Sequence, residues 1–216
     1  YWTFEKVLSV EQSKNVRSTF FFLQESAKVC FHDYKTWRHA GRRYKFFDKN
    51  IVSCMQDMDS QGWEVGLHGS FHSFTDYDTF KFEKEELQSA LGNRIWGVRQ
   101  HNLNLKIPDT WWIHEKTGLA YDTTLGCNDY IGFRWGTCFP FRFCMNNNTE
   151  SLNLIEIPLI VEDTAYFRSD TPWIDFLDIA GSVENVHGIM TLLWHHSVFN
   201  EFEFPGWCDT YEKMID

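Results

Sequence analysis

Two histidines, His68 and His72, stand at the end of a short apolar run that begins at Trp63. Imidazole nitrogens bind Zn²⁺ and similar divalent ions, and a catalytic zinc site usually combines three protein ligands with one position for water. We therefore predict that His68 and His72 bind a divalent metal ion, with Zn²⁺ as the expected ion and a carboxylate as the third ligand. The spacing alone is a weak signal, because histidines also pack in partly buried structural positions.

Other polar residues also come at or just after the expected end of an apolar strand. They are Arg99, Asp122, Asp163 and His195. The carboxyl ends of parallel strands meet at one edge of a sheet, so these residues can converge on one cleft. Arg99 could instead form a surface salt bridge, Asp163 could cap a helix, and His195 could be a core histidine. Their shared position favours a common site. The histidines that lack this position are interpreted as structural or exposed, namely His32, His101, His114 and His187.

Strand and helix patterns alternate along almost the whole chain, which predicts a parallel sheet with helical crossovers. We expect helices at 2–14, 48–61, 78–91, 108–117 and 173–186. Strands are expected at 16–23, 63–72, 95–98, 119–121, 152–161 and 188–194. So few strands favour an α/β fold with an open or incomplete barrel over a closed barrel of eight units. The segment 126–148 is expected to be a long aromatic loop.

Length and composition restrict the class of protein. The 216 residues fit one domain, and an aromatic content of 18% leaves side chains for a binding cleft. A formal net charge of −10 argues against a nucleic-acid partner, which would need a basic face. No apolar run approaches the roughly 20 residues of a membrane span, so we expect none and expect a cytoplasmic protein. The chain begins on a helix and with Tyr1, so we expect a single domain over 1–216 that lacks its first strand.

Several short segments occur in an order that is known from one family. They are Ser18–Phe22, His68–His72, Gly97–His101, Tyr121–Gly126, Gly132–Cys138, Ile157–Asp163 and Leu193–His195. This series resembles the polysaccharide deacetylases, also called NodB-homology or carbohydrate esterase family 4 domains. Within it, His68–His72 resembles the metal-binding H-[ST]-x-x-H motif, and Leu193–His195 resembles the closing L-x-H motif. The resemblance covers nearly the whole chain, and its specificity lies in the order and spacing of the segments.

The chain departs from the family pattern in two places. Gly69 follows the first histidine where the family has Ser or Thr, and Ser70 comes one position later. The family's first motif, an acidic pair that supplies the catalytic base and the third metal ligand, would lie before Tyr1. We therefore expect weak metal binding by this chain alone, and stronger binding once the preceding segment is added.

The resemblance implies a distorted, incomplete (β/α) barrel of the NodB type. It also implies a metal-dependent hydrolase that removes N-acetyl or O-acetyl groups from a polysaccharide or a sugar intermediate. His68 and His72 would hold the metal, and Arg99 would orient the catalytic base. His195 would protonate the leaving nitrogen, and Asp163 would tune His195. The expected partner is an acetylated amino-sugar polymer or intermediate.

Two alternatives stay open at this stage. The first is a non-catalytic carbohydrate-binding or scaffold domain that retains the fold, and the second is a deacylase for a small or lipid-linked sugar. The aromatic loop 127–143 is either a wall of the substrate site or a packed cap on the barrel, because functional and packing loops share this composition.

Overall fold

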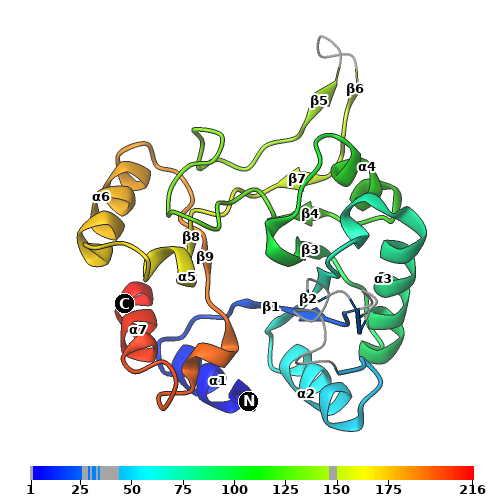
Figure 1. Ribbon diagram of the computed structural model, residues 1–216, viewed down its shortest axis with the longest axis horizontal. Coiled ribbons are helices and arrows are strands. Elements are labelled where there is room, and N and C mark those ends of the chain that lie inside the picture. Colours follow the sequence, from blue (N-terminus) through cyan, green and yellow to red (C-terminus); the bar gives the residue numbers. More distant parts are fainter. Residues whose placement is uncertain (1, 26–28, 30, 33, 35–43, 146–149) are drawn as a thin grey trace.

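The computed structural model describes residues 2–216 except 26–28, 30, 33, 35–43 and 146–149. Its main sheet has five strands in the order β1-β2-β3-β4-β7, and each neighbouring pair is parallel. These strands are β1 (Thr19–Leu23), β2 (Glu64–Gly69), β3 (Gly97–Gln100), β4 (Tyr121–Asp122) and β7 (Ile155–Glu156). A second parallel pair joins β8 (Val161–Glu162) and β9 (Leu192–Leu193). The antiparallel pair of β5 (Cys144–Met145) and β6 (Glu150–Ser151) projects from this framework (Figure 1).

Helices connect β1 to β2, β2 to β3, β3 to β4 and β8 to β9, and α1 and α7 flank the described strands, so the predicted α/β fold with a parallel sheet is confirmed. They are α1 (Phe4–Ser13), α2 (Lys49–Ser60), α3 (Tyr77–Leu91), α4 (Asp109–Lys116), α5 (Asp163–Tyr166), α6 (Pro172–Asn185) and α7 (Trp207–Ile215). Short 3-10 turns follow β2 at Ser73–Thr75 (η2), β3 at His101–Leu103 (η3) and β9 at His196–Phe199 (η4). Figure 1 shows α2, α3 and α4 on one side of the main sheet, and α1, α7, α5 and α6 around the β8–β9 pair.

The largest core lies between the main sheet and helices α2 to α4. Leu67 and Val98 of adjacent strands are fully buried there against Met55 of α2 and Leu87 of α3. A smaller core joins α1, η4 and α7, and a third packs α6 against β8. Burial of these apolar faces is the main force that holds the helices on the strands.

The described strands form an open barrel. β1 is one edge of the main sheet and β9 belongs to the separate β8–β9 pair, with no hydrogen-bonded pairing between β1 and β9 among the described strands. Glu11 of α1 links the surrounding elements, because its carboxylate accepts hydrogen bonds from Trp63 Nε1 at 2.6 Å and from the Tyr211 hydroxyl of α7 at 2.7 Å. The predicted open or incomplete barrel agrees with this arrangement.

Several predicted boundaries were wrong, two of them for clear local reasons. The helix predicted at 78–91 begins one residue earlier, because Asp76 is the N-cap of α3 and its side chain accepts a hydrogen bond from the Thr79 backbone N–H at 3.1 Å. The expected strand 152–161 is divided into β7 and β8. Pro158 has no N–H to donate at the break, and Leu159 N donates to the Leu125 carbonyl at 3.0 Å instead of joining a strand neighbour.

The aromatic loop after β4 packs as a cap. Trp135 lies edge-to-face against buried Trp111 of α4 with ring centroids 5.5 Å apart, and it stacks on Phe141 at 5.9 Å. Such aromatic pairs are held by ring quadrupoles and by burial. Of the two interpretations of the loop, these contacts support the packed cap. Within the described ranges, no helix is both long and apolar enough to cross a bilayer.

Candidate functional site

A cavity of about 310 Å³ lies between α1, β1, β9 and α7. Its lining includes His68, Arg99 and His195, which come from β2, β3 and the end of β9. Residues 68 and 99 are paired in register on adjacent parallel strands, so their side chains leave the sheet on the same face. The structure therefore brings three of the predicted site residues to one place.

His195 and Asp163 form a hydrogen-bonded dyad at the edge of this cavity. Asp163 directly follows Glu162, which pairs with Leu193 in the β8–β9 ladder, and His195 comes two residues after Leu193. The His195 ring donates from Nδ1 to Asp163 Oδ1 at 2.9 Å, and the His195 backbone N–H donates to Oδ2 at 2.6 Å. Asp163 is fully buried, whereas 48% of the His195 side chain is exposed. The carboxylate thus fixes the imidazole orientation and leaves Nε2 for a ligand.

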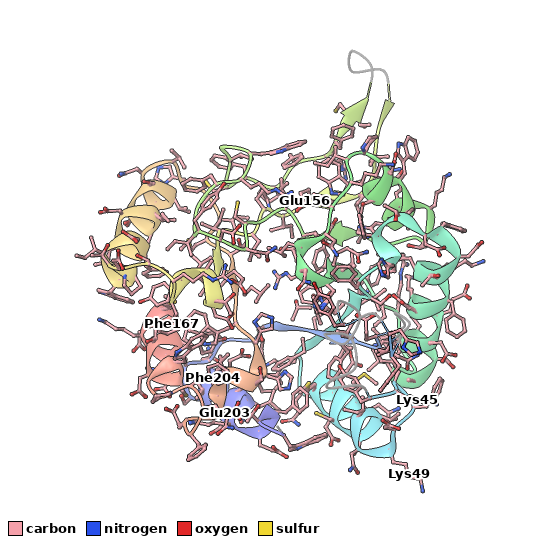
Figure 2. All side chains as sticks on the ribbon, viewed as in Figure 1. Lys45, Lys49, Glu156, Phe167, Glu203 and Phe204 are labelled. Atoms are coloured by element: carbon pink, nitrogen blue, oxygen red, sulfur yellow. The ribbon has the colours of Figure 1, made fainter. Side chains whose placement is uncertain are left out.

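The electrostatic surroundings favour a protonated His195. Burial works against the charged imidazolium, but the hydrogen bond and charge of Asp163 and the charge of Glu162 outweigh it, so the pKa of His195 is raised. Figure 2 labels Phe167, which follows α5 and stacks on Trp207 of α7 with ring centroids 3.8 Å apart. This contact anchors α5, and with it the buried Asp163, against α7.

Glu162 is a site residue that we did not predict. Ligand-type atoms of Glu162, Asp163 and His195 lie within 4.8 Å of one another, which makes this group a candidate for holding a cation. Glu162 is also the N-cap of α5 and accepts a 2.6 Å hydrogen bond from Ala165 N. Burial, together with the charge of Asp163, raises the pKa of Glu162. Because Nδ1 of His195 and both carboxylates already make these internal bonds, we interpret the group as an acid dyad with a neighbouring helix cap.

His68 is prepared as a neutral imidazole. Its Nδ1 lies 2.7 Å from the Arg99 carbonyl oxygen, which can only accept, so Nδ1 carries the proton and Nε2 holds a lone pair. Burial, followed by the neighbouring His101, lowers the pKa of His68 to about 3. A neutral ring whose other nitrogen bonds to a carbonyl is the form in which histidine binds metals. His68 therefore fits a metal ligand.

Arg99 is a buried cation beside His68. Its Nε donates to the Thr123 carbonyl at 3.1 Å and its Nη2 to Thr123 Oγ1 at 3.0 Å, and its guanidinium lies over the Phe21 ring. Burial lowers the pKa of Arg99 to about 10, which leaves the side chain charged at neutral pH. Within the part of the chain that the structure describes, no carboxylate forms an ion pair with Arg99. Two neutral acceptors leave guanidinium N–H groups for an anion.

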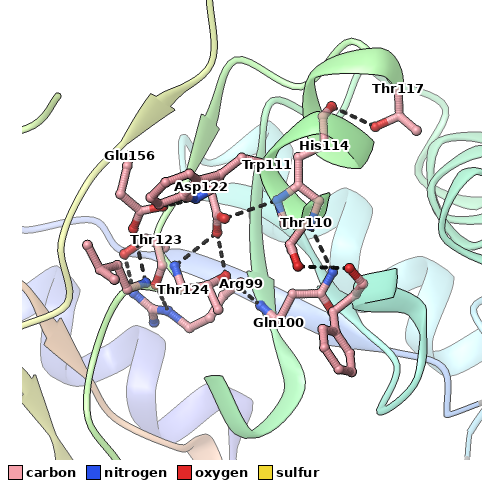
Figure 3. Close-up of polar contacts among 12 residues, drawn as sticks. Arg99, Gln100, Thr110, Trp111, His114, Thr117, Asp122, Thr123, Thr124 and Glu156 are labelled. Carbon is pink, nitrogen blue, oxygen red and sulfur yellow. Dashed lines mark hydrogen bonds and ion pairs between the residues drawn. The ribbon is translucent and has the colours of Figure 1, made fainter. Parts of the chain in front are cut away.

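A buried polar network fixes the turn around Thr123, the residue that accepts the hydrogen bonds of Arg99 (Figure 3). Asp122 accepts from Thr124 N at 2.9 Å and from His114 Nδ1 at 3.0 Å, and the other His114 nitrogen lies 2.8 Å from Gln100 Nε2. Asp122 fixes the turn that carries Thr123 and is buried away from the cavity lining. His114 is structural, as predicted.

Glu156 extends the network on the next strand. It accepts from Trp111 Nε1 at 2.8 Å and from Leu125 N at 3.0 Å (Figure 3). Burial, and then the charge of Asp122, raises the pKa of Glu156 well above its usual range. These hydrogen bonds and its burial place Glu156 in the framework of the site.

Comparisons with known proteins decide the fold. The chain superimposes on a protein assigned as a polysaccharide deacetylase from Mycobacterium smegmatis with a TM-score of 0.64 and 18% identity, covering 99% of this chain and 69% of that one. The chain has the fold of the polysaccharide deacetylases. A protein assigned to the same class from Pseudomonas aeruginosa PAO1 gives a TM-score of 0.61 with 12% identity over 99% of this chain and 65% of that one. Puue allantoinase gives a TM-score of 0.62 with 14% identity, and the match covers 98% of this chain and 64% of that one.

The sequence comparisons are negative. No family model matches the chain, and no curated protein sequence matches it. The chain spans less than two thirds of the length of two of the three solved structures, 64% and 65%. The deacetylase fold is therefore established by three-dimensional similarity alone.

The structure places His72 at the surface and His101 beside His68. His72 lies exposed at the N-cap of η2, with its ring edge-to-face against Phe71 at 4.9 Å, and it is not part of the cavity lining. Its role as a metal ligand stays a prediction. His101, which we interpreted as structural or exposed, instead lies beside His68, with 3.3 Å between His101 Nδ1 and His68 Nε2. Had the strand been predicted to end at Gln100, His101 would have been recognised as a residue at a strand end.

Proposed function

We propose that this chain forms the core of a metal-dependent hydrolase that removes N-acetyl or O-acetyl groups from a polysaccharide or a sugar intermediate. The observation that carries the proposal is the His195–Asp163 dyad on the same cavity as His68 and Arg99. The deacetylase fold supports it.

His195 is suited to act as the general acid. An amide nitrogen is a poor leaving group until it is protonated, so hydrolysis needs a donor at that atom. His195 donates Nδ1–H to Asp163, which fixes the orientation of the ring, and the raised pKa favours the protonated imidazolium, whose second proton is on Nε2. Asp163 is therefore the positioning residue for His195.

His68 and Arg99 prepare the opposite part of the cavity. His68 holds a neutral nitrogen that can bind a divalent ion, and when bound, such an ion supplies Lewis acidity toward the acyl oxygen and toward water. Arg99 offers a fixed positive charge that would orient a carboxylate base. These roles use a neutral imidazole, a protonated imidazole and a guanidinium in one site.

The expected substrate is an acetylated amino sugar, either within a polymer or as an intermediate. Aromatic residues, including Phe20, Tyr44 and Trp194, line the cavity beside His195. Aromatic faces combined with a few polar groups are typical of small-molecule sites. This lining supports a sugar-sized ligand.

The test is acetate release from acetylated chito-oligosaccharides by the natural protein that contains this chain. His195→Gln, which keeps a polar side chain without an imidazole, is expected to lower kcat by about 10²- to 10⁴-fold, the usual contribution of a general acid. His187→Asn replaces an exposed histidine outside the cavity lining and serves as the matched control. Equal activity of wild type and His195→Gln would refute the assigned acid.

A non-catalytic carbohydrate-binding domain is the second candidate function. It is favoured by the environment of Arg99, which has no ion-paired carboxylate within the described ranges. In that case the wild-type protein binds the oligosaccharide without releasing acetate, and His195→Gln changes only the binding constant.

A further inference from the structure

His101 occupies a position on the inner face of the main sheet. β3 ends at Gln100, so His101 is the first residue after the strand. Side chains alternate along a strand, which places residue 101 on the same face as Arg99. Arg99 is in turn the registered partner of His68 on β2. His68 and His101 are therefore diagonal neighbours on the face that borders the cavity.

The two imidazoles lie at the separation of two ligands on one metal ion. His68 Nε2 and His101 Nδ1 are 3.3 Å apart, and the ring planes are nearly perpendicular at 83°. Zinc binds imidazole nitrogen at about 2.0–2.1 Å, and two such bonds at the tetrahedral angle hold their nitrogens about 3.3–3.4 Å apart. The observed separation therefore matches two ligands of one tetrahedral ion, as well as a hydrogen bond between the two rings.

The position of the proton on His68 also fits a metal-binding imidazole. Its Nδ1 donates to the Arg99 carbonyl at 2.7 Å, so the nitrogen directed at His101 carries a lone pair. His101 Nδ1 either donates a proton to that lone pair or presents a lone pair of its own. In the second tautomer, only a cation between the two nitrogens makes the contact favourable. A backbone carbonyl on the remote nitrogen is also the usual support for a metal-bound histidine.

The backbone after β3 is strained in a way that maintains this contact. Asn102 and Leu103 both have left-handed conformations, with φ of 55° and 51°. Leucine rarely adopts this region, and each such residue costs about 1–3 kcal/mol unless the surroundings enforce it. Asn128 Nδ2 donates to the Asn102 carbonyl at 2.8 Å, and Asn104 Nδ2 donates to the Phe71 carbonyl at 3.0 Å. The turn is thus held in the shape that sets His101 against His68.

We propose that His68 Nε2 and His101 Nδ1 form the imidazole pair of the metal site. The inference rests on the proposed function, since it assigns a ligand to the metal that this function uses. It differs from the ligand set of the H-x-x-x-H motif, in which His72 is the second imidazole. In our assignment, His72 is a surface residue of the turn after β2.

Equilibrium metal binding tests the assignment without reference to catalysis. The natural protein is stripped with a chelator and titrated with Zn²⁺ against a chromogenic competitor, and the visible spectrum of the Co²⁺ form is recorded. We expect His101→Ala and His68→Ala to weaken Zn²⁺ binding by on the order of 100-fold or more, because each removes a ligand. His72→Ala is the matched comparison and is expected to stay within about 3-fold of wild type, since no ligand is lost. His32→Ala is an exposed control.

Each outcome decides the assignment. If His101→Ala binds Zn²⁺ with wild-type affinity, the assignment is overturned, whether or not His72→Ala loses the metal. If both His101→Ala and His72→Ala lose Zn²⁺ binding, the result supports His101 as a ligand and adds His72 as a further one. Far-ultraviolet circular dichroism of the metal-free proteins checks folding, and His101→Asp, which keeps a ligand atom, repeats the test if the alanine variant unfolds. Partial recovery of binding by His101→Asp supports ligation.

Failure of the proposed function has a different signature. A protein that binds Zn²⁺ through His101 and releases no acetate from any acetylated sugar would leave this assignment intact and refute the hydrolase. A protein that releases acetate while His101→Ala binds Zn²⁺ normally would refute only the ligand pair. A wild-type protein that binds neither Zn²⁺ nor Co²⁺ refutes both.

Discussion

Replacing Asp163 by Asn isolates the role of the dyad, because the amide keeps the size of the side chain and removes its charge. In the wild type, Asp163 is fully buried and accepts hydrogen bonds from His195 Nδ1, from His195 N at 2.6 Å and from Thr164 N at 2.7 Å. The acceptor in all three hydrogen bonds is the carboxylate anion of Asp163. An amide has one acceptor oxygen, and its NH₂ group would face donors.

The size of the effect follows from these contacts. A hydrogen bond to a charged group contributes about 1.5–3 kcal/mol, so loss of one or two of them lowers stability by about 2–5 kcal/mol. The same change removes the carboxylate charge that raises the pKa of His195. It also removes the acceptor that holds the proton on Nδ1 of the imidazole. Loss of the acid is expected to lower kcat by about 10²- to 10⁴-fold.

The pH dependence has a definite sign. Because the folded protein raises the pKa of His195, the protonated ring is more favourable in the folded state, and this contribution is fully present below the unfolded-state pKa. It is lost as the pH rises through the folded-state pKa. The stability difference between wild type and Asp163→Asn should therefore be largest at acidic pH and smaller at alkaline pH. The basic limb of the rate profile should move to lower pH in the variant.

Urea unfolding at several pH values and steady-state acetate release on the same samples measure both effects. Asp178→Asn, the same replacement at an exposed aspartate of α6 outside the cavity lining, is a control that leaves the dyad in place. A variant that loses stability equally at all pH values, and keeps both its kcat and its basic limb, would show that Asp163 is only structural.

Three further predictions concern the metal ligand and the framework. His68→Ala should abolish Zn²⁺ uptake measured by elemental analysis, and unchanged stoichiometry would move the site elsewhere. Glu156→Gln should unfold at a lower urea concentration than wild type at acidic pH, because its NH₂ group would face one of the two donors, Trp111 Nε1 or Leu125 N. This deficit should shrink as the pH rises, because a buried carboxyl with a raised pKa loses stability in that direction whereas the amide does not; an identical pH profile for both proteins would contradict this. Gly97→Ala should destabilise by about 1–3 kcal/mol, since a Cβ would meet the Tyr121 ring at 2.0 Å. Gly181→Ala in α6 has no atom within 4 Å of the new Cβ and should stabilise by about 0.5–1 kcal/mol in the same thermal unfolding assay; the reverse order would refute the packing described around β3.

Much of the fold could be predicted, because local patterns carry it. The apolar periodicity of α2 and α3 and the alternation of helix and strand indicate a parallel sheet before any contact is known. Gly92 follows α3 in the left-handed conformation, and the helix ends at the predicted residue 91. The boundary at Asp76 was missed because two nearby Asp residues, 76 and 78, could each cap the helix. The boundary at Pro158 was missed because the partners of residues near this proline lie far away in the sequence.

The site was predictable where a strand end was correctly located. Asp163 directly follows β8 and His195 comes two residues after the end of β9, and their contact agrees with the expected convergence. The end of β3 lies two residues later than predicted, since its ladder with β2 continues through Gly69 and Gln100. This difference concealed His101. Glu162 was missed because its carboxylate caps a short helix, and neighbouring residues alone do not reveal that role.

By itself, the sequence determined the chemical groups of this protein and their order along alternating strands and helices, since composition and short-range periodicity are properties of neighbouring residues. Only the tertiary structure decided which groups meet. The pairing of His68 with Arg99 places residue 101 on the same face of the sheet as His68, whereas His72 follows a turn and lies at the surface. The choice between these two imidazoles depends on strand register and on a strained turn held by distant side chains. Such contacts form only when the chain is folded.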